Sequence, residues 1–177
     1  MPRPLVGIDL DGVVALEDYN AYMKAKAEGA SALRNYYQTL KVNEAFVTEL
    51  QKNYHRYRFI IVTARRDDVP DIKQITLDWL KEHRLDALFI DVVFTGNAWK
   101  WPWLIKDRVV AHIDNDYSNL KWCPFMYRLA YNHFVRHNWF YDNVNTPWQD
   151  VHDLATPHFR HKVSYLFDFL NKVCYTK

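Results

Sequence analysis

The sequence is poor in glycine and serine, and this scarcity excludes several common loops that bind nucleotides or esters. Its 177 residues contain four glycines, at positions 7, 12, 29 and 96. Neither the G-x-x-x-x-G-K-[ST] phosphate loop nor the G-x-G-x-x-G dinucleotide loop can be written with them. The three serines lie outside any G-x-S-x-G nucleophile elbow, which excludes a serine hydrolase of that type.

Cysteine, net charge and long apolar runs are also scarce. Cys123 and Cys174 are the two cysteines, which make neither a disulfide framework nor a C-x-x-C metal site. The amino terminus lacks the features of a secretory signal, and no apolar run approaches the roughly 20 residues of a membrane helix. We therefore expect a reduced, cytoplasmic protein that has no membrane partner. The net charge of +2 argues against a nucleic-acid partner without excluding one.

What the chain does contain is a regular alternation of apolar runs and helical patterns. Hydrophobic residues make up 49% of it and aromatic residues 16%, enough for the core of one domain. Short, nearly continuous apolar runs predict strands over residues 4–10, 57–62, 88–94 and 109–113. Helical patterns cover residues 15–54, with a break near Gly29 and Ser31, then residues 71–83 and a closing helix after Phe159. This order predicts an α/β fold with a parallel sheet.

Acidic residues follow the first predicted strand. Asp9 and Asp11 are two positions apart, so both side chains leave the same side of an extended chain. Two carboxylates that close repel each other unless a cation or a shared proton compensates them. A hard divalent cation such as Mg²⁺ would do so, and Gly12 would let the backbone turn sharply beside it. A solvated turn is the alternative interpretation.

The other strand ends add groups that can bind a phosphate and oxygen atoms that can bind a cation. Thr63 offers a hydroxyl beside free backbone amides, which suits a phosphate oxygen. Lys100 follows the third strand and supplies a compact positive charge. Asp114 and Asn115 end the fourth strand with further oxygen ligands. Because the carboxyl ends of parallel strands share one edge of the sheet, these residues predict a cation and phosphate site there.

Four segments resemble the motifs of the haloacid dehalogenase-like phosphatases: VGIDLDGVV, IIVTAR, a later lysine and HIDND. The resemblance covers about residues 5–120 and is greatest to the 5′(3′)-deoxyribonucleotidases with their bacterial and phage relatives. It implies a Rossmann-like parallel sheet flanked by helices, with a small helical cap inserted after the first strand. The core would comprise residues 1–14 and 55–177, and the cap residues 15–54.

The resemblance also implies catalytic roles. Asp9 would be the nucleophile that forms an aspartyl-phosphate, and Asp11 the general acid and then the general base. Thr63 and the Ala64 amide would bind phosphoryl oxygens. Lys100 would neutralise charge on the nucleophile and the phosphate, with Lys106 as the alternative lysine.

A magnesium ion is implied as the cofactor. Its ligands would be Asp9, the Asp11 backbone carbonyl, Asp114 and Asn115. The fourth motif reads Asp-Asn-Asp, where many relatives have adjacent acids, so Asp116 stays open as an alternative to Asn115.

These assignments predict a Mg²⁺-dependent phosphomonoesterase whose substrate is a small phosphorylated metabolite, most simply a (deoxy)nucleoside monophosphate. Arg65 and Tyr19 are candidate substrate contacts, whereas most other cap aromatics are expected to pack the cap onto the body. The alternatives are a polynucleotide 3′-phosphatase, a phosphoprotein phosphatase, and a binding module without turnover. The histidines at 133, 137, 158 and 161 are interpreted as surface or core residues. Residues 121–177 have no assigned role, and a homodimer contact is one option for them.

Overall fold

A computed structural model describes residues 2–96, 98–116, 119–120, 126–131 and 163–175. Its centre is a parallel five-stranded sheet in the order β5-β4-β1-β6-β7. The strands are β1 (Leu5–Ile8), β4 (Arg58–Thr63), β5 (Phe89–Phe94), β6 (Ala111–Asp114) and β7 (Tyr127–Ala130). This confirms the predicted α/β class and four of the strands; β7 was not predicted.

The central position of β1 decides where a site can form. The chain passes from β1 outward through β4 to β5, and then returns to the other side of β1 with β6 and β7. The connections on the two sides of β1 therefore run in opposite directions. In open parallel sheets, such a reversal opens a crevice beyond the carboxyl ends of the strands. The residues after Ile8 lie at this crevice.

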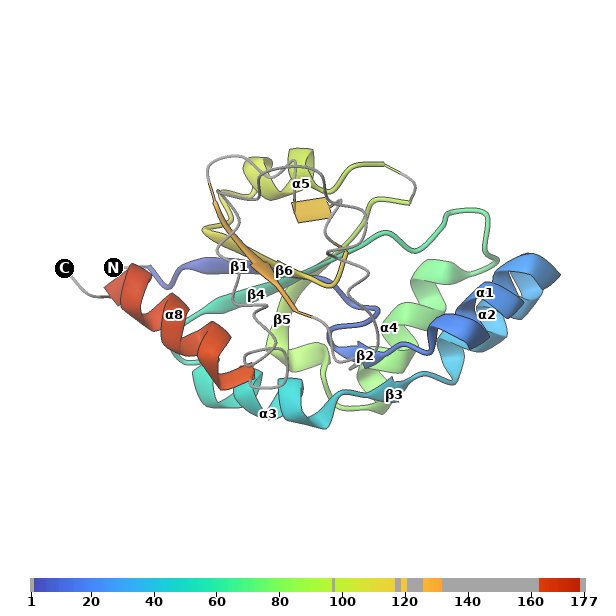
Figure 1. Cartoon of the computed structure of the whole chain (residues 1–177), viewed down its shortest axis with the longest axis horizontal. Helices are drawn as coiled ribbons and strands as arrows, with labels where there is room; N and C mark the ends of the chain where they lie inside the picture. The colour runs from blue at the N-terminus through green and yellow to red at the C-terminus, as the bar shows by residue number, and fades with distance from the viewer. Residues whose placement is uncertain (1, 97, 117–118, 121–125, 132–162, 176–177) are drawn as a thin grey trace.

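The helices cover both faces of the sheet (Figure 1). On one face lies α5 (Trp101–Lys106), and on the other lie α3 (Glu44–Asn53), α4 (Ile72–Glu82) and α8 (Val163–Tyr175). A short 3-10 turn, Asp86–Leu88, leads into β5.

Alternation along β4 builds two cores. Phe59 and Ile61 belong to the large cluster with α3, α4 and α8, whereas Ile60 and Val62 pack with Leu104 of α5. Successive side chains of a strand point to opposite faces, so a strand buried on both sides is apolar throughout.

The segment 15–54 differs from the two helices predicted for it. It forms three helices and a two-stranded antiparallel ribbon: β2 (Ala15–Leu16), α1 (Tyr19–Glu28), α2 (Ala30–Gln38), β3 (Lys41–Val42) and α3. The break at Gly29, with φ of 107°, was predicted. The second break lies between Gln38 and Glu44, where β3 follows α2 and Asn43 caps α3, its Oδ1 accepting from the Phe46 amide at 3.3 Å.

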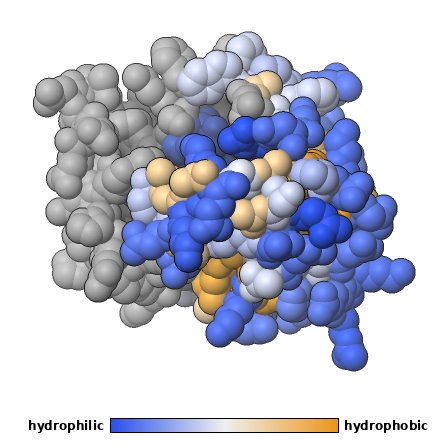
Figure 2. All heavy atoms as spheres, turned by 90° about the vertical axis from the view of Figure 1, so that its right-hand side faces the viewer, coloured by the Kyte–Doolittle hydropathy of each residue, from blue (hydrophilic) through white to orange (hydrophobic). Residues whose placement is uncertain are grey.

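The two parts of this segment pack differently. In α3, Phe46, Val47 and Leu50 are buried, and the Phe46 ring centroid lies 6.4 Å from that of Phe167 in α8. The pair α1 and α2 buries fewer residues, and the surface seen from this side is mostly hydrophilic with a narrow apolar band (Figure 2). The division into a core and a cap stays a prediction, with α3 packed on the core side.

The closing helix was predicted, and α8 buries Leu166, Phe167 and Leu170 in the large core. Its Asn171 accepts from the Tyr57 hydroxyl at 3.0 Å. None of the helices in the described ranges is long and apolar enough to span a membrane. The four histidines named above and Cys123 lie outside the described residues.

Candidate active site

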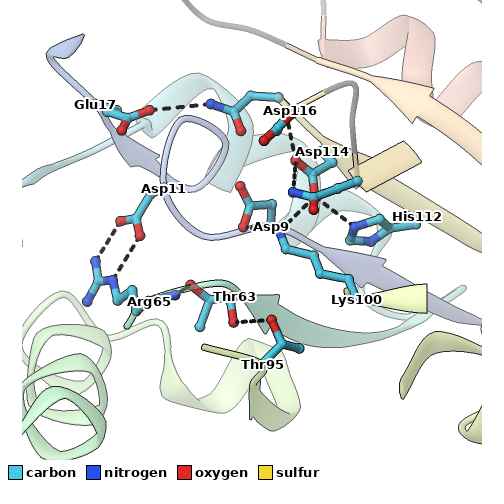
Figure 3. Close-up of polar contacts among 12 residues, drawn as sticks. Asp9, Asp11, Glu17, Thr63, Arg65, Thr95, Lys100, His112, Asp114 and Asp116 are labelled. Atoms are coloured by element: carbon cyan, nitrogen blue, oxygen red, sulfur yellow. Dashed lines mark hydrogen bonds and ion pairs between the residues drawn. The ribbon is translucent and has the colours of Figure 1, made fainter. Parts of the chain in front are cut away.

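Lys100 joins two aspartates from neighbouring strands (Figure 3). Its Nζ lies 2.6 Å from Oδ1 of Asp9, after β1, and 2.7 Å from Oδ2 of Asp114, at the end of β6. All three side chains are buried. The backbone fixes the two loops together as well, because the Asp9 amide donates to the Ile113 carbonyl at 2.8 Å. Residues far apart in the sequence thus form one compact charged group.

The charges in this group are unbalanced. Burial by itself would lower the pKa of Lys100, but Asp114 and Asp9 outweigh it and raise that pKa above its ordinary value. Burial would raise the pKa of Asp114, but Lys100 and His112 hold it at about 2. Burial together with the Asp114 carboxylate raises the pKa of Asp9, against the opposing effect of Lys100. One ammonium therefore compensates one buried carboxylate and leaves the second in need of positive charge.

His112 anchors Asp114 from inside the sheet. Its Nε2 lies 2.9 Å from Asp114 Oδ2, and burial lowers the pKa of the ring. Because an ionised carboxylate only accepts, Nε2 carries the hydrogen of a neutral imidazole. Among the described residues, His112 Nδ1 is a buried atom without a hydrogen-bond partner. Sequence analysis missed His112, because a histidine inside an apolar strand carries no catalytic signature.

Gly12 brings the first loop against the turn after β6. Its φ is +84°, and a Cβ there would lie 1.9 Å from Nδ2 of Asn115. Only glycine adopts this backbone conformation without strain and leaves room for the amide. The predicted juxtaposition of the Asp-Leu-Asp-Gly loop with the Asp-Asn turn is therefore present in the structure.

Asp11 points away from Asp9, toward Arg65 (Figure 3). The Arg65 Nε and Nη2 donate to its two carboxylate oxygens at 2.9 and 2.7 Å. Asp11 thus has a cation of its own in Arg65, whereas Asp9 shares Lys100 with Asp114. The two carboxylates were expected on the same side of the chain; in the structure Asp11 turns to Arg65 instead, because the guanidinium offers it two hydrogen bonds.

Thr63 ends the neighbouring strand on the same edge of the sheet. Its hydroxyl accepts from the Arg65 amide at 3.3 Å, which leaves the hydroxyl hydrogen to donate to an anion. The Thr63 carbonyl accepts from the amide of Thr95 at 2.9 Å and from its hydroxyl at 3.2 Å, which ties the ends of β4 and β5 together. The following residue, Ala64, is exposed.

Glu17 is a further acidic residue here that sequence analysis did not select. Its carboxylate accepts from Asn115 Nδ2 at 3.4 Å. Burial, with a contribution from Asp11, raises the pKa of Glu17 to about 7. The amide of Asp116 donates to Asp114 Oδ1 at 2.7 Å and so fixes the turn that holds Asn115.

The donor chemistry fits a hard divalent cation, although the aspartates are arranged around Lys100. In the part of the chain that the structure describes, no three His, Cys, Asp or Glu side chains form a metal cluster by themselves. The ammonium lies between Asp9 and Asp114, and Asp11 is turned to Arg65. Even so, the site gathers oxygen donors and more negative charge than its two cations balance, which is what Mg²⁺ requires. The set is Asp9, Asp11, Glu17, Asp114 and Asp116, with the amide oxygen of Asn115.

The remaining predicted residues lie apart from this group. Lys106 is at the end of α5, with its Nζ 5.8 Å from the Trp103 ring centroid, so Lys100 is the lysine that contacts the aspartates. Tyr19 begins α1 and is exposed. Arg65 was expected to contact substrate, but the residue is only 1% exposed and its side chain is engaged by the protein.

Comparison with known proteins supports the fold. No protein-family model matches the sequence, and no curated protein is significantly similar to it. A haloacid dehalogenase-like hydrolase from Streptococcus pneumoniae superposes with a TM-score of 0.57 at 11% identity, covering 95% of this chain and 98% of that one. This chain has the haloacid dehalogenase-like fold.

Two further structures of this fold agree. A beta-phosphoglucomutase candidate from Thermotoga maritima gives a TM-score of 0.53 at 14% identity over 77% of this chain and 88% of that one. A hydrolase of the same superfamily from Geobacter sulfurreducens gives 0.50 at 13% identity over 73% and 90%. The haloacid dehalogenase-like fold hosts more than one chemistry, so the function has to be argued from the residues of the site.

Proposed function

We propose that this protein is a Mg²⁺-dependent phosphomonoesterase that acts through a phosphoryl group carried on Asp9. The observation that carries the proposal is the contact of Lys100 with both Asp9 and Asp114 at the carboxyl ends of the central strands. A nucleophilic carboxylate, a fixed cation and a second aspartate two residues later are the groups that a two-step phosphoryl transfer needs.

In the first step, an oxygen of Asp9 attacks phosphorus, and the bond from phosphorus to the ester oxygen breaks. Asp11 gives a proton to that departing oxygen. In the second step, water attacks the same phosphorus and gives a proton to Asp11, and the bond to Asp9 breaks. Inorganic phosphate and the alcohol are released, and both aspartates return to their starting state.

The other residues bind and orient the phosphoryl group. The Thr63 hydroxyl and the Ala64 amide would donate to its oxygens, and the Lys100 ammonium would balance its charge. The ion would be held by Asp9, the Asp11 carbonyl and the turn of Asp114 and Asn115. When bound, Mg²⁺ supplies the positive charge that keeps Asp9 ionised and steadies the phosphoryl oxygens.

A nucleoside monophosphate is the proposed substrate class, because half-buried aromatic rings of α1 and α2 lie near the acidic residues. The ring centroids of Tyr22 and Tyr36 are 5.9 Å apart. The Tyr36 ring centroid lies 5.6 Å from that of Tyr37, and Tyr37 packs on Arg65, the partner of Asp11, so these rings are close to the site. Stacking of a base on an aromatic ring contributes about 1–3 kcal/mol.

A panel of phosphate esters tests this function. It contains p-nitrophenyl phosphate, nucleoside 5′- and 3′-monophosphates, a 3′-phosphorylated oligonucleotide and a phosphoserine peptide, each assayed for phosphate release with Mg²⁺ or with EDTA. We expect Mg²⁺-dependent release, greatest from a mononucleotide. Preference for the oligonucleotide or the peptide would instead assign one of the alternative phosphatase activities.

Asp9→Asn provides the matched test of mechanism, because it replaces one carboxylate oxygen by an NH₂ group and keeps the size of the side chain. It should abolish release while the circular dichroism spectrum is retained. The control is Asp86→Asn, an exposed residue just before β5 at the opposite end of the sheet. Absence of turnover of every ester by the wild-type protein would favour the binding-module interpretation.

A further inference from the structure

Arg65 is held on three sides by three different elements. It follows β4, and its Nε and Nη2 donate to the two oxygens of Asp11. Its Nη1 donates to Oγ1 of Thr76 in α4 at 2.9 Å. The face of the guanidinium lies on the Tyr37 ring of α2, with Cζ 4.4 Å from the ring centroid. Both the edges and the face of this planar group are therefore occupied.

The geometry favours arginine specifically. Two parallel N–H bonds to one carboxylate need the rigid fork of a guanidinium, which a lysine ammonium lacks. The Thr76 hydroxyl donates to the Ile72 carbonyl at 2.6 Å, so its lone pairs are directed to accept from Arg65. We call Arg65, Thr76 and Tyr37 the Arg65 clamp.

We propose that Arg65 is a positioning residue, which orients the Asp11 carboxylate for proton transfer and does not bind substrate. The inference rests on the proposed phosphomonoesterase function and deepens it. Gly12 fixes the backbone beside Asp11, but the side chain of Asp11 would still rotate about its own bonds. The two hydrogen bonds from Arg65 remove that freedom. They also hold the Asp11 carboxylate away from Asp9. This separation is favourable because the two like charges repel each other.

The burial of Arg65 argues against a direct role of this residue in substrate binding. The Arg65 side chain is fully buried, and its Nε, Nη1 and Nη2 each donate to a protein oxygen. A phosphate would have to break the pair with Asp11 to reach it. The neighbouring Arg66, by contrast, is partly exposed and pairs with Asp68, two residues along the chain. The chain therefore offers two adjacent arginines of different environment.

The clamp also connects the acid–base residue to the segment 15–54, because Tyr37 belongs to α2, whereas Thr76 belongs to α4 outside that segment. A change in how α2 packs would alter the surface on which Arg65 rests, and through it the orientation of Asp11. Substitutions at Tyr37 and Thr76 should therefore affect proton transfer although neither side chain contacts Asp11 through a hydrogen bond of its own.

The test compares two leaving groups. p-Nitrophenolate departs without needing a proton, whereas an alkoxide needs one from the general acid. Arg65→Lys should lower kcat for the best alkyl phosphate of the panel by at least about tenfold, which is part of the 10²–10⁴-fold that general acid–base catalysis typically contributes. It should lower kcat for p-nitrophenyl phosphate by less than about threefold, with KM unchanged for both esters. Arg66→Lys, the matched control, should change neither.

Thr76→Val and Tyr37→Leu extend the test to substitutions that keep the buried charge pair. Both should show the same dependence on the leaving group in weaker form, so the inference stays testable if Arg65→Lys does not fold. An equal loss of kcat for both esters, or a raised KM with unchanged kcat, would overturn the positioning role; the second result would make Arg65 a substrate-binding residue. If the wild-type protein cleaves neither ester, the proposed function itself fails, and the inference with it.

Discussion

The ammonium nitrogen of Lys100 lies 2.6 Å from Oδ1 of Asp9, and both side chains are buried. This contact crosses 91 positions of the sequence and joins the loop after β1 to the segment that precedes α5. It places a fixed positive charge on the proposed nucleophile before any substrate arrives. A buried charge without its partner is costly, so this contact links stability to the proposed activity.

Replacement of Lys100 by methionine should therefore damage both properties. Lys100→Met leaves two carboxylates buried around an apolar side chain, and breaking a buried pair in this way costs about 3–5 kcal/mol. We expect kcat to fall by at least about 10²-fold, as for the loss of one electrostatic donor. Urea denaturation and phosphate release measure the two effects. Lys106→Met is the control, and equal effects of both substitutions would contradict the assignment of Lys100.

Gly12 and Gly29 allow backbone strain to be separated from crowding in the site. Both have positive φ values, +84° and +107°, but a Cβ at Gly29 meets nothing within 4 Å. Each alanine substitution should lower the free energy of unfolding by about 1–3 kcal/mol through strain. Only Gly12→Ala, which would clash with Asn115, should also abolish phosphate release. Retained activity in Gly12→Ala would show that the close contact of the two loops is dispensable.

The metal assignment predicts a specific change in the magnesium requirement. Asn115→Ala should raise the Mg²⁺ concentration that gives half-maximal activity, because it removes an oxygen ligand from the turn after β6. Asp116→Asn, the comparison variant, should leave that concentration closer to the wild-type value. Magnesium titrations of phosphate release decide between them, and the opposite order of effects would make Asp116 the ligand.

The docking of α8 should weaken at alkaline pH. Burial raises the pKa of Tyr57 above its ordinary value of 10.0, and its hydroxyl donates to Asn171 of α8. As pH rises through about 10, the unfolded chain loses this proton before the folded chain does, so the free energy of unfolding falls. Tyr57→Phe should cost about 0.5–1.5 kcal/mol at pH 8 by removing the hydrogen bond. The same substitution should also make the free energy of unfolding fall less steeply as the pH rises above about 10.

Urea denaturation at a series of pH values measures this effect. Tyr54→Phe is the control, because Tyr54 is exposed. An unchanged alkaline profile in Tyr57→Phe would show that the Tyr57 proton is not linked to folding.

The sequence predicted those parts of the site that depend on strand ends. Asp9, Asp11 and Asp114 directly follow apolar runs, and parallel strands bring such positions to one edge of the sheet. Lys100 was favoured over Lys106 because it follows the third strand at short range. The backbone arrangement of a parallel sheet is therefore enough to bring these residues together.

The rest depended on side-chain directions and on local packing that leave little trace in a single sequence. Nothing in the order of residues indicates that Asp11 turns to Arg65. Nor does it indicate that Thr76, 11 residues after Arg65 and outside the four motifs, accepts a hydrogen bond from the same guanidinium. Glu17 and His112 become part of the site only through burial. The ribbon of β2 and β3 was missed because each strand has two residues, too few for a periodic pattern.

Detection of the phosphorylated enzyme tests the central claim most directly. The protein is mixed with a ³²P-labelled substrate from the panel and Mg²⁺, quenched in acid within one turnover, digested and mapped by mass spectrometry. The account predicts transient label on the peptide that contains Asp9, discharged by hydroxylamine and absent from Asp9→Asn. Rapid turnover with no labelled protein, or with the phosphoryl group on a residue other than Asp9, would contradict it.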